Sequence, residues 1–148
     1  MIFISKSATK TQNLAKKFAK KLKGGEIVLL SGNLGAGKTV FVKGLAKGLG
    51  VKELITSPSF VLLKDYGKLV HIDLYRLSKI KDIKALGLLE ELGNPQKITV
   101  VEWAEKIKPF LKNLKAPQVW VEIKYVDKNT RRIMQSSKCK SQNDNCKM

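Results

Sequence analysis

A three-layer α/β domain with a mainly parallel central sheet is the fold that this sequence predicts. Two unbroken apolar runs, at 26–30 (EIVLL) and 97–102 (KITVVE), have the length and composition of parallel strands that are buried on both faces. The first run leads through a glycine-rich stretch into a segment with helical periodicity, and further helical patterns separate the later strands. Two apolar runs on either side of Gly67 predict an antiparallel hairpin in the same sheet.

The N-terminal region predicts a short edge strand and then an amphipathic helix. Residues 2–4 (IFI) fit the strand, and residues 9–23 fit the helix, with lysines on its outer face. Ser7 or Thr9 can cap the start of this helix, and the glycine pair at 24 and 25 can end it. The apolar positions that recur every fourth residue are Leu14, Phe18 and Leu22.

Residues 32–39 (GNLGAGKT) form a complete G-x-x-x-x-G-K-[ST] phosphate-binding motif, preceded by a strand pattern and followed by a helix pattern at 38–49. In such a loop, backbone N–H groups surround phosphate oxygens, a lysine neutralises their charge and a hydroxyl binds Mg²⁺. We therefore expect a P-loop NTPase-like fold, with Lys38 on the phosphates of a nucleotide and Thr39 on the metal. The other cofactor-binding residues expected from this motif are Asn33, Leu34, Gly35, Ala36, Gly37 and Val40.

The rest of the chain predicts a hairpin, two helical segments and three strands. These elements span, in order, 61–74 with a turn at Gly67, 79–92 with an interruption near Gly87, 97–102, 103–114 with a break near Pro109, 118–126 and 130–135. In the strand at 118–126, apolar and polar residues alternate, which places Val119, Val121, Ile123 and Tyr125 on one face.

Two acids stand at the carboxyl ends of apolar runs, Asp73 in LVHIDL and Glu102 in ITVVE. Ligands of α/β sheets bind at that edge, and a phosphate loop needs an acid to hold Mg²⁺ and position water. We expect Lys38, Asp73 and Glu102 to be the catalytic residues. Glu102 joins Thr39 as a metal ligand and Asp73 orients water, although these residues alone also allow the two acids to exchange roles. A packing role is favoured for His71.

The formal charge of the chain is +17, and 26 of its 29 basic residues are lysines. A basic surface attracts nucleic acid because binding releases counterions from the phosphates. Compositional bias explains the same lysines equally well, because they are spread along the whole chain. The three arginines, Arg76, Arg131 and Arg132, are therefore more informative than any single lysine.

Four motifs, GNLGAGKT, ITSPSF, HIDLYRL and VVEWAEK, resemble the TsaE family in their order and spacing, over about residues 5 to 135. The resemblance implies that ATP and Mg²⁺ are the cofactors and that hydrolysis is slow in the protein alone. It also implies that the protein works with TsaB and TsaD in the threonylcarbamoylation of adenosine 37 of tRNA. Ser59 stands where that family usually has threonine.

The resemblance also implies roles for individual residues. Lys38 and Thr39 take the family's phosphate and metal positions, Glu102 the second metal ligand, and Asp73 the acid of the HxDLYR motif. Thr11 corresponds to a position near the nucleotide base, and Arg132 to an arginine on a late strand that reaches the nucleotide. The resemblance predicts an ATPase domain at 1–135. Residues 136–148 are polar and almost without apolar residues, which predicts a disordered tail that contains Cys139 and Cys146.

Two other functions are compatible with the phosphate loop. A small kinase would need a lid with several arginines, and this chain has only three, of which Arg76 is the candidate for an arginine finger. A non-hydrolysing module would use the nucleotide to switch a surface that binds tRNA or protein, but the two strand-end acids favour metal-assisted hydrolysis. The chain shows no signal peptide pattern and no run of about 20 apolar residues, so we expect a cytoplasmic protein without membrane contact.

Overall fold

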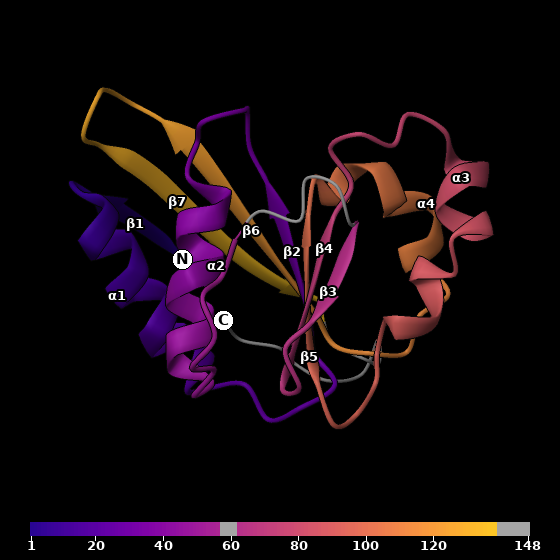
Figure 1. Cartoon of the computed structure of the whole chain (residues 1–148). Coiled ribbons are helices and arrows are strands. Elements are labelled where there is room, and N and C mark those ends of the chain that lie inside the picture. Colours follow the sequence, from indigo (N-terminus) through magenta and orange to yellow (C-terminus); the bar gives the residue numbers. More distant parts are fainter. Residues whose placement is uncertain (57–61, 139–148) are drawn as a thin grey trace.

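The computed structural model describes residues 1–56 and 62–138, which form one sheet with helices on both sides (Figure 1). The strands of the described residues are β1 (Ile2–Ser5), β2 (Ile27–Ser31), β3 (Leu63–Asp65), β4 (Leu69–Asp73), β5 (Ile98–Glu102), β6 (Gln118–Tyr125) and β7 (Arg131–Lys138). The helical elements are α1 (Ala8–Ala19), α2 (Lys38–Gly48), α3 (Ile80–Ala85), α4 (Lys108–Leu111) and the 3₁₀ turns η1 (Leu88–Glu91) and η2 (Ala104–Ile107). None of the helices in these residues is long and apolar enough for a bilayer crossing.

The strand order in the sheet is β1-β7-β6-β2-β5-β4-β3. The four central strands, β6, β2, β5 and β4, are parallel, as expected for a sheet whose middle is buried on both faces. The hairpin around Gly67 is confirmed as the antiparallel pair β3–β4. The sheet is less parallel than predicted, because β7 also runs antiparallel to both β6 and β1, so that half of the six pairings are antiparallel.

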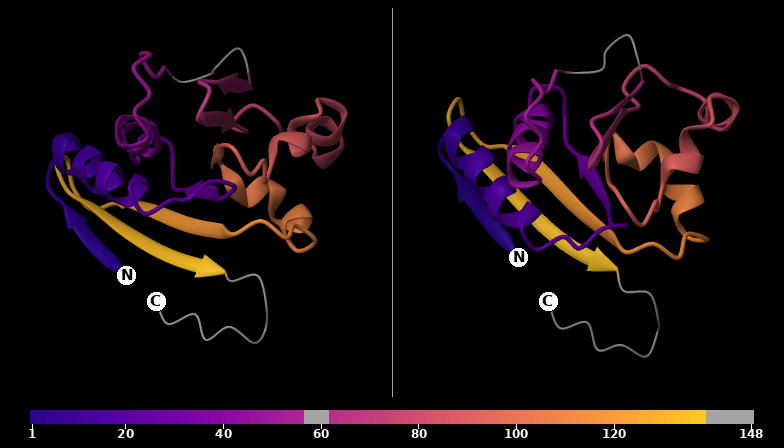
Figure 2. Two further views of the ribbon diagram at one scale, coloured as in Figure 1. Left: turned by 90° about the horizontal axis from the view of Figure 1, so that it is seen from below. Right: turned by 60° about the horizontal axis from the view of Figure 1, so that its bottom comes forward.

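Side chains of β2 alternate between two hydrophobic cores, which gives the molecule its three layers. Val28 and Leu30 pack with α1 and α2, whereas Ile27 and Leu29 pack with the α3, η2 and α4 side. All four are fully buried, since β2 is central in the sheet and helices cover both of its faces (Figure 2). The predicted three-layer arrangement is therefore confirmed.

The first helix is shorter than predicted. Ser7 caps its start, as expected, because the Ser7 side chain accepts a hydrogen bond from the backbone N–H of Lys10. The helix ends at Ala19 and not at residue 23. The Glu26 carboxylate accepts hydrogen bonds from the N–H groups of Lys23 and Gly24, so the chain there is held in a turn rather than in further helix.

The segment at 103–114 forms two short pieces, η2 and α4, rather than one helix. Pro109 lies in the first turn of α4, where a residue without an N–H group leaves no hydrogen bond unmade. The predicted break therefore falls just before the proline. Tyr125 shares a face of β6 with Val119, Val121 and Ile123, as predicted, but it is 60% exposed at the end of the strand.

The last strand extends beyond the predicted domain boundary. Residues 136–138 continue the antiparallel pairing of β7 with β6, where Gln118 is opposite Lys138. The expectation of disorder from residue 136 is wrong for these three residues, because β6 begins at Gln118 and pairs with them. Cys139, Cys146 and the rest of the tail lie outside the described residues, as does the ITSPSF loop from residue 57 to residue 60.

Two glycines in α2 allow α1 to pack directly against it. A Cβ atom at Gly44 would lie 2.3 Å from the backbone oxygen of Gln12, and one at Gly48 would lie 2.6 Å from that of Lys16. Since Gly44 and Gly48 are one helical turn apart, they form a continuous groove for the backbone of α1.

We predict that Gly44→Ala destabilises the protein although alanine is the better helix former. Alanine gains roughly 1 kcal/mol of helix propensity, whereas overpacking against backbone atoms costs about 1–3 kcal/mol. Urea denaturation measures the change in the free energy of unfolding between the wild-type protein and the variant. Lys43→Ala in the same helix is the control. A rise in the free energy of unfolding for Gly44→Ala would show that the two helices separate easily.

Candidate nucleotide and metal site

The phosphate loop connects β2 to α2, and its glycines are required by its backbone shape. Gly32, Gly35 and Gly37 all have positive φ angles, of 150°, 78° and 105°. A Cβ atom at Gly32 would also lie 2.4 Å from the backbone oxygen of Ile123 in β6, so the loop approaches the sheet more closely than a larger residue allows. The α2 helix then begins directly at Lys38 with its N–H groups facing the loop.

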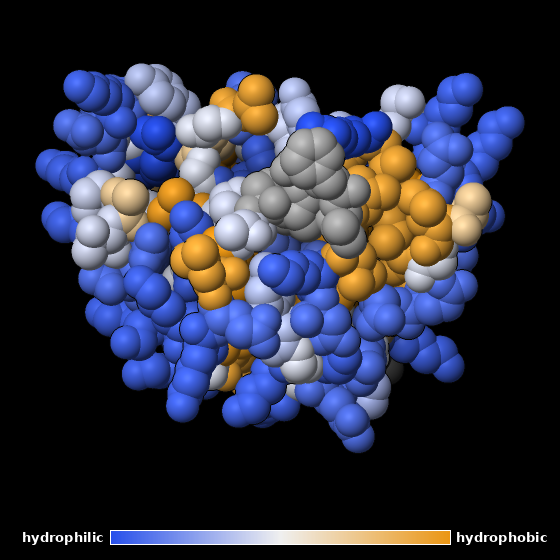
Figure 3. Space-filling model, in the orientation of Figure 1, coloured by the Kyte–Doolittle hydropathy of each residue, from blue (hydrophilic) through white to orange (hydrophobic). Residues whose placement is uncertain are grey.

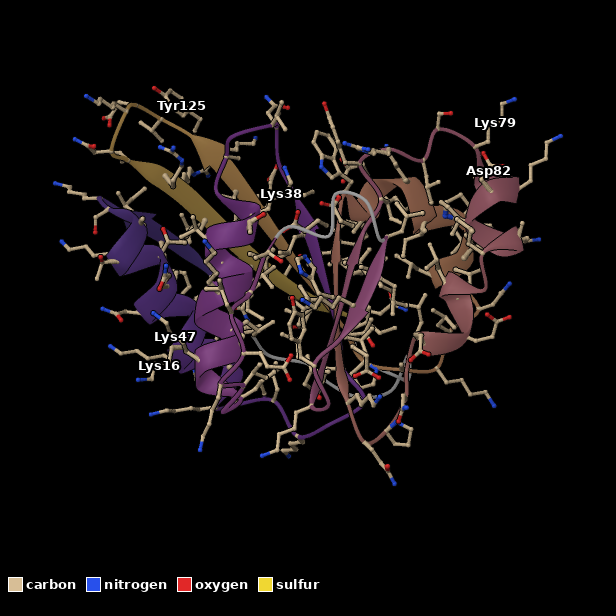
Figure 4. All side chains as sticks on the ribbon, viewed as in Figure 1. Lys16, Lys38, Lys47, Lys79, Asp82 and Tyr125 are labelled. Atoms are coloured by element: carbon tan, nitrogen blue, oxygen red, sulfur yellow. The ribbon has the colours of Figure 1, made fainter. Side chains whose placement is uncertain are left out.

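The Lys38 side chain is buried inside this loop and points toward the space between α2 and the central strands (Figure 4). Its ammonium group donates hydrogen bonds to the backbone oxygens of Gly32 and Asn33 and lies 4.2 Å from the centre of the Trp103 ring. Burial lowers the pKa of Lys38, while the carboxylates of Glu102, Glu105 and Asp73 act to raise it. The group is thus partly desolvated and ready to exchange carbonyl oxygens for those of an anion.

The two strand-end acids lie side by side. The parallel register of β4 and β5 places Asp73 opposite Glu102, and both side chains are almost fully buried. The Thr39 hydroxyl at the start of α2 donates a 3.0 Å hydrogen bond to Oε1 of Glu102. The structure therefore brings together Lys38, Thr39, Asp73 and Glu102 from three parts of the chain.

The two carboxyl groups have opposite electrostatic environments. Burial raises the pKa of Asp73, and the negative charge of the neighbouring Glu102 raises it further. The hydrogen bond that Asp73 accepts from the backbone N–H of Tyr75 acts in the opposite direction but is outweighed. Burial also acts to raise the pKa of Glu102, but the contacts with His71 and Thr39 outweigh it and hold that pKa below its ordinary value. Glu102 is therefore the carboxylate that stays ionised, and Asp73 is the one that accepts a proton more readily.

The oxygen atoms of Thr39 and Glu102 fit the requirements of Mg²⁺. Both are hard ligands, they are close enough to share one ion, and two protein ligands leave the remaining positions of an octahedron to phosphate and water. The favoured assignment of Glu102 to the metal and Asp73 to water is consistent with the pKa directions of the two acids.

His71 is completely buried on β4 and lies against this group of residues. Its Nε2 atom is 3.3 Å from Oε1 of Glu102, although neither ring nitrogen makes an aligned hydrogen bond with the described residues. The sequence favoured a packing role for His71. The structure adds a contact with Glu102 that only the pairing of β4 with β5 could reveal.

Lys38, Thr39, Asp73 and Glu102 line a cleft of about 450 Å³. Its lining consists of Leu34, Gly35, Gly37, Lys38, Thr39, Val40, Leu62, Asp73, Tyr75, Arg76, Glu102 and Trp103. Asn33 contributes a backbone oxygen to Lys38, while Ala36 is buried in the core beneath the loop. Most of the loop residues predicted to bind cofactor are thus in place around one cavity.

A second hollow of about 260 Å³ lies on the other side of the phosphate loop. Thr11 lines it, and the hollow shares Gly37 and Val40 with the main cleft. The Thr11 hydroxyl is 2.7 Å from the Ser5 hydroxyl, which itself donates to a backbone oxygen, so Thr11 is fixed in position. Thr11 thus lies beside the phosphate loop, and its place near the nucleotide base stays a prediction.

The arginine of the late strand that contacts this region is Arg131 and not Arg132. The Nε atom of Arg131 donates a 2.9 Å hydrogen bond to the backbone oxygen of Ala36, and its guanidinium group stacks on Tyr125. Arg132 pairs in register with Ile4, which is 57% exposed on the opposite face of the sheet. The expectation that Arg132 reaches the nucleotide stays a prediction that this register does not favour, because adjacent strand residues point to opposite faces.

Lys106, which the sequence did not single out for a role, holds the turn that follows β4. Its ammonium group donates three 2.8 Å hydrogen bonds, to the backbone oxygens of Leu74, Tyr75 and Leu77. It also lies 5.7 Å from the centre of the Trp103 ring. Three donors on one ammonium group match three converging carbonyl groups, so this lysine positions the segment that carries Tyr75 and Arg76 into the cleft.

Trp103 is the only residue other than glycine with a positive φ angle among the described residues, at 59°. This conformation follows directly after Glu102 and turns the indole ring toward the cleft, where it contacts Lys38 and packs on Tyr75. No local sequence signal indicates a left-handed tryptophan, so only the structure could show its position.

Residues 5–133 match the family described as "Threonylcarbamoyl adenosine biosynthesis protein TsaE". The chain belongs to the TsaE family. It is 40% identical over 136 residues to the tRNA threonylcarbamoyladenosine biosynthesis protein TsaE of Aquifex aeolicus, covering 88% of this chain and 91% of that one. It is 43% identical over 107 residues to the TsaE protein of Treponema pallidum, covering 70% and 78% of the two chains.

The fold of this TsaE family member is also similar to a solved structure. The crystal structure of YdiB from Bacillus subtilis matches with a TM-score of 0.71 at 29% identity, over 93% of this chain and 84% of that one. The residues that match the family description, 5–133, include the phosphate loop, the two strand-end acids and Arg131. The resemblance inferred from the four motifs is therefore confirmed at the level of the family.

We predict that Lys106→Met loosens the turn after β4 while the rest of the fold remains intact. Loss of three charge-assisted hydrogen bonds should speed amide hydrogen exchange at residues 74–77 by at least about tenfold, which corresponds to roughly 1.4 kcal/mol. Mass-spectrometric hydrogen exchange measures this, and Lys112→Met serves as the control because Lys112 is an exposed lysine in the same region. Equal exchange rates in the two variants would contradict the positioning role.

Proposed function

We propose that this protein hydrolyses ATP with Mg²⁺ and that the reaction supports the threonylcarbamoylation of adenosine 37 in tRNA, in cooperation with TsaB and TsaD. The observation that carries the proposal is the hydrogen bond from Thr39 to Glu102 beside the buried Lys38. A hydroxyl and an ionised carboxylate next to a phosphate loop form a pair of metal ligands at the place where a γ-phosphate would lie. Membership in a family named for tRNA threonylcarbamoyladenosine biosynthesis supports the pathway.

In the proposed reaction, Lys38 leaves the backbone oxygens of Gly32 and Asn33 and binds the phosphates. Mg²⁺, held by Thr39 and Glu102, would supply positive charge to the phosphate oxygens. Asp73 accepts a hydrogen bond from the attacking water, and its raised pKa suits a group that accepts a proton during the reaction. The rings of Trp103 and Tyr75 cover one side of the cleft and limit the access of other water molecules.

The geometry favours hydrolysis over the two alternative functions. Among the described residues, Arg76 is the only arginine that lines the main cleft, whereas a kinase would need several to enclose an acceptor. A nucleotide switch would need a phosphate loop, but it would not need two buried carboxyl groups at the γ-phosphate position. With one arginine in the cleft, the protein alone should be slow, and a partner protein can supply a further charge.

The decisive measurement is phosphate release from ATP and Mg²⁺ by the protein alone, with TsaB and TsaD, and with tRNA added. We expect slow release alone and a change in rate with the partners. Lys38→Ala and Thr39→Ala should each lower the rate by about 10²–10³-fold, because each removes a group that stabilises the transition state. Lys43→Ala on the outer side of α2 is the control. Tight ATP binding without phosphate release under any condition would favour the nucleotide switch.

A second prediction separates the two neighbouring arginines. Arg131→Ala should weaken ATP binding about tenfold, or 1.4 kcal/mol, because Arg131 holds the backbone oxygen of Ala36 in the loop. Arg132→Ala should change the dissociation constant less than about twofold, since its side chain lies on the opposite face. Isothermal titration calorimetry measures both. A larger effect at Arg132 would mean that the register of β7 differs when nucleotide is bound.

A further inference from the structure

The N-terminal third of the chain carries many lysines and almost no acids. Residues 1–52 contain eleven lysines, no arginine and a single acid, Glu26. The Glu26 carboxylate is already occupied by two backbone N–H groups. We use the term lysine face for the exposed and half-exposed lysines of α1, of the turn after it and of α2. They are Lys10, Lys16, Lys17, Lys20, Lys21, Lys23, Lys43 and Lys47.

The lysines of α1 project from one side of the helix. At 100° per residue, they fall within an arc that lies opposite the buried residues Thr11, Ala15, Phe18 and Ala19. On α2, Lys43 and Lys47 are one turn apart and also lie outside the core. The hydrophilic surface over these two helices is visible in Figure 3.

Close packing joins the two sets of lysines into one surface. Gly48 lets the backbone of α2 approach that of Lys16, and Lys16 and Lys47 lie beside each other at the side of the molecule in Figure 4. The Lys47 ammonium group donates a 2.8 Å hydrogen bond to the Gln12 side chain across the helix pair. The charges are thus held on a rigid support, because α1 and α2 cannot move apart without losing this packing.

The lysine face has no ion-pair partner among the residues that the structure describes. In residues 1–56 and 62–138, the lysines that form ion pairs are Lys97 and Lys124, and neither belongs to this face. Uncompensated like charges repel each other, and the repulsion is relieved when a polyanion binds. A phosphate backbone is the polyanion that gains most, because its condensed counterions are released on binding.

We propose that the lysine face binds the phosphate backbone of RNA without reading its sequence. Lysine is a point charge suited to phosphate, and the face has no arginine fork for base edges. An anionic membrane is a poorer partner, because the apolar side of α1 is buried against α2 and is unavailable for insertion. The choice of RNA among nucleic acids rests on the proposed function, while the charge argument does not.

The test compares two triple charge reversals that change the net charge equally. Lys16→Glu/Lys20→Glu/Lys47→Glu alters the lysine face. Lys79→Glu/Lys81→Glu/Lys112→Glu alters exposed lysines around α3 and α4 at the opposite end of the molecule, where Figure 4 labels Lys79. Fluorescence anisotropy with labelled tRNA, and with an RNA duplex of unrelated sequence, measures binding over a range of salt concentrations without ATP, TsaB or TsaD.

We call the Lys79/Lys81/Lys112 variant the α3–α4 variant and the Lys16/Lys20/Lys47 variant the lysine-face variant. For each RNA, we expect the dissociation constants of the wild-type protein and the α3–α4 variant to agree within about threefold. The lysine-face variant should bind at least about tenfold more weakly, and the slope of its binding constant against salt on logarithmic axes should fall by about 2–3. Equal weakening in both variants would show that only net charge matters and would overturn the proposal. Absence of RNA binding by the wild-type protein would also overturn it, including the case in which anionic phosphatidylglycerol vesicles bind instead.

Thermal unfolding verifies that both triple variants are folded. Phosphate release from ATP provides an independent readout, because none of the six substituted lysines lines the cleft. If the wild-type protein releases no phosphate but binds RNA through the lysine face, the proposed hydrolysis fails and the inference about the surface stands. If phosphate is released and RNA binding is unaffected by the lysine-face substitutions, the inference fails and the proposed hydrolysis stands.

Discussion

The parallel pairing of β5 with β2 on one side and β4 on the other is the constraint on which the candidate site depends. In this register, Leu30 at the end of β2 is opposite Glu102, and Glu102 is opposite Asp73. All three strands therefore end at one edge of the sheet, and the phosphate loop begins there one residue after β2. A shift of one residue in β5 would turn Glu102 to the other face and separate it from Thr39.

Burial of ionisable groups at this edge of the sheet lowers the stability of the fold, but it also makes these groups more responsive to a bound anion or metal ion. Lys38, Asp73 and Glu102 are all almost completely removed from water, together with His71. Each charge is compensated by a contact that comes from another element: loop carbonyl groups for Lys38, a backbone N–H group for Asp73, and Thr39 and His71 for Glu102. Such a group of partly desolvated charges responds strongly to an incoming phosphate or metal ion, because the local dielectric constant is low.

The parts of the molecule outside this edge act mainly as supports. Lys106 fixes the turn after β4, Arg131 fixes the phosphate loop from the side of β7, and the glycine groove of α2 fixes α1. These supports come from distant points in the chain, and each contacts backbone atoms of the segment that it holds. They add to the contacts that Thr11 makes with Ser5 and that Tyr75 makes with Asp73 and Trp103.

The sequence by itself determined the elements and the chemistry that depend on local patterns. The phosphate loop, the hairpin at Gly67, the two buried strands and the strand-end acids Asp73 and Glu102 all follow from residue order, because glycine conformation and hydrophobic periodicity act over a few residues. Only the tertiary structure decided the pairing of β7 with β1 and β6, the choice of Arg131 over Arg132, and the roles of Lys106 and Trp103. Those features depend on strand register and on contacts between residues far apart in the chain, for which the sequence contains no local signal.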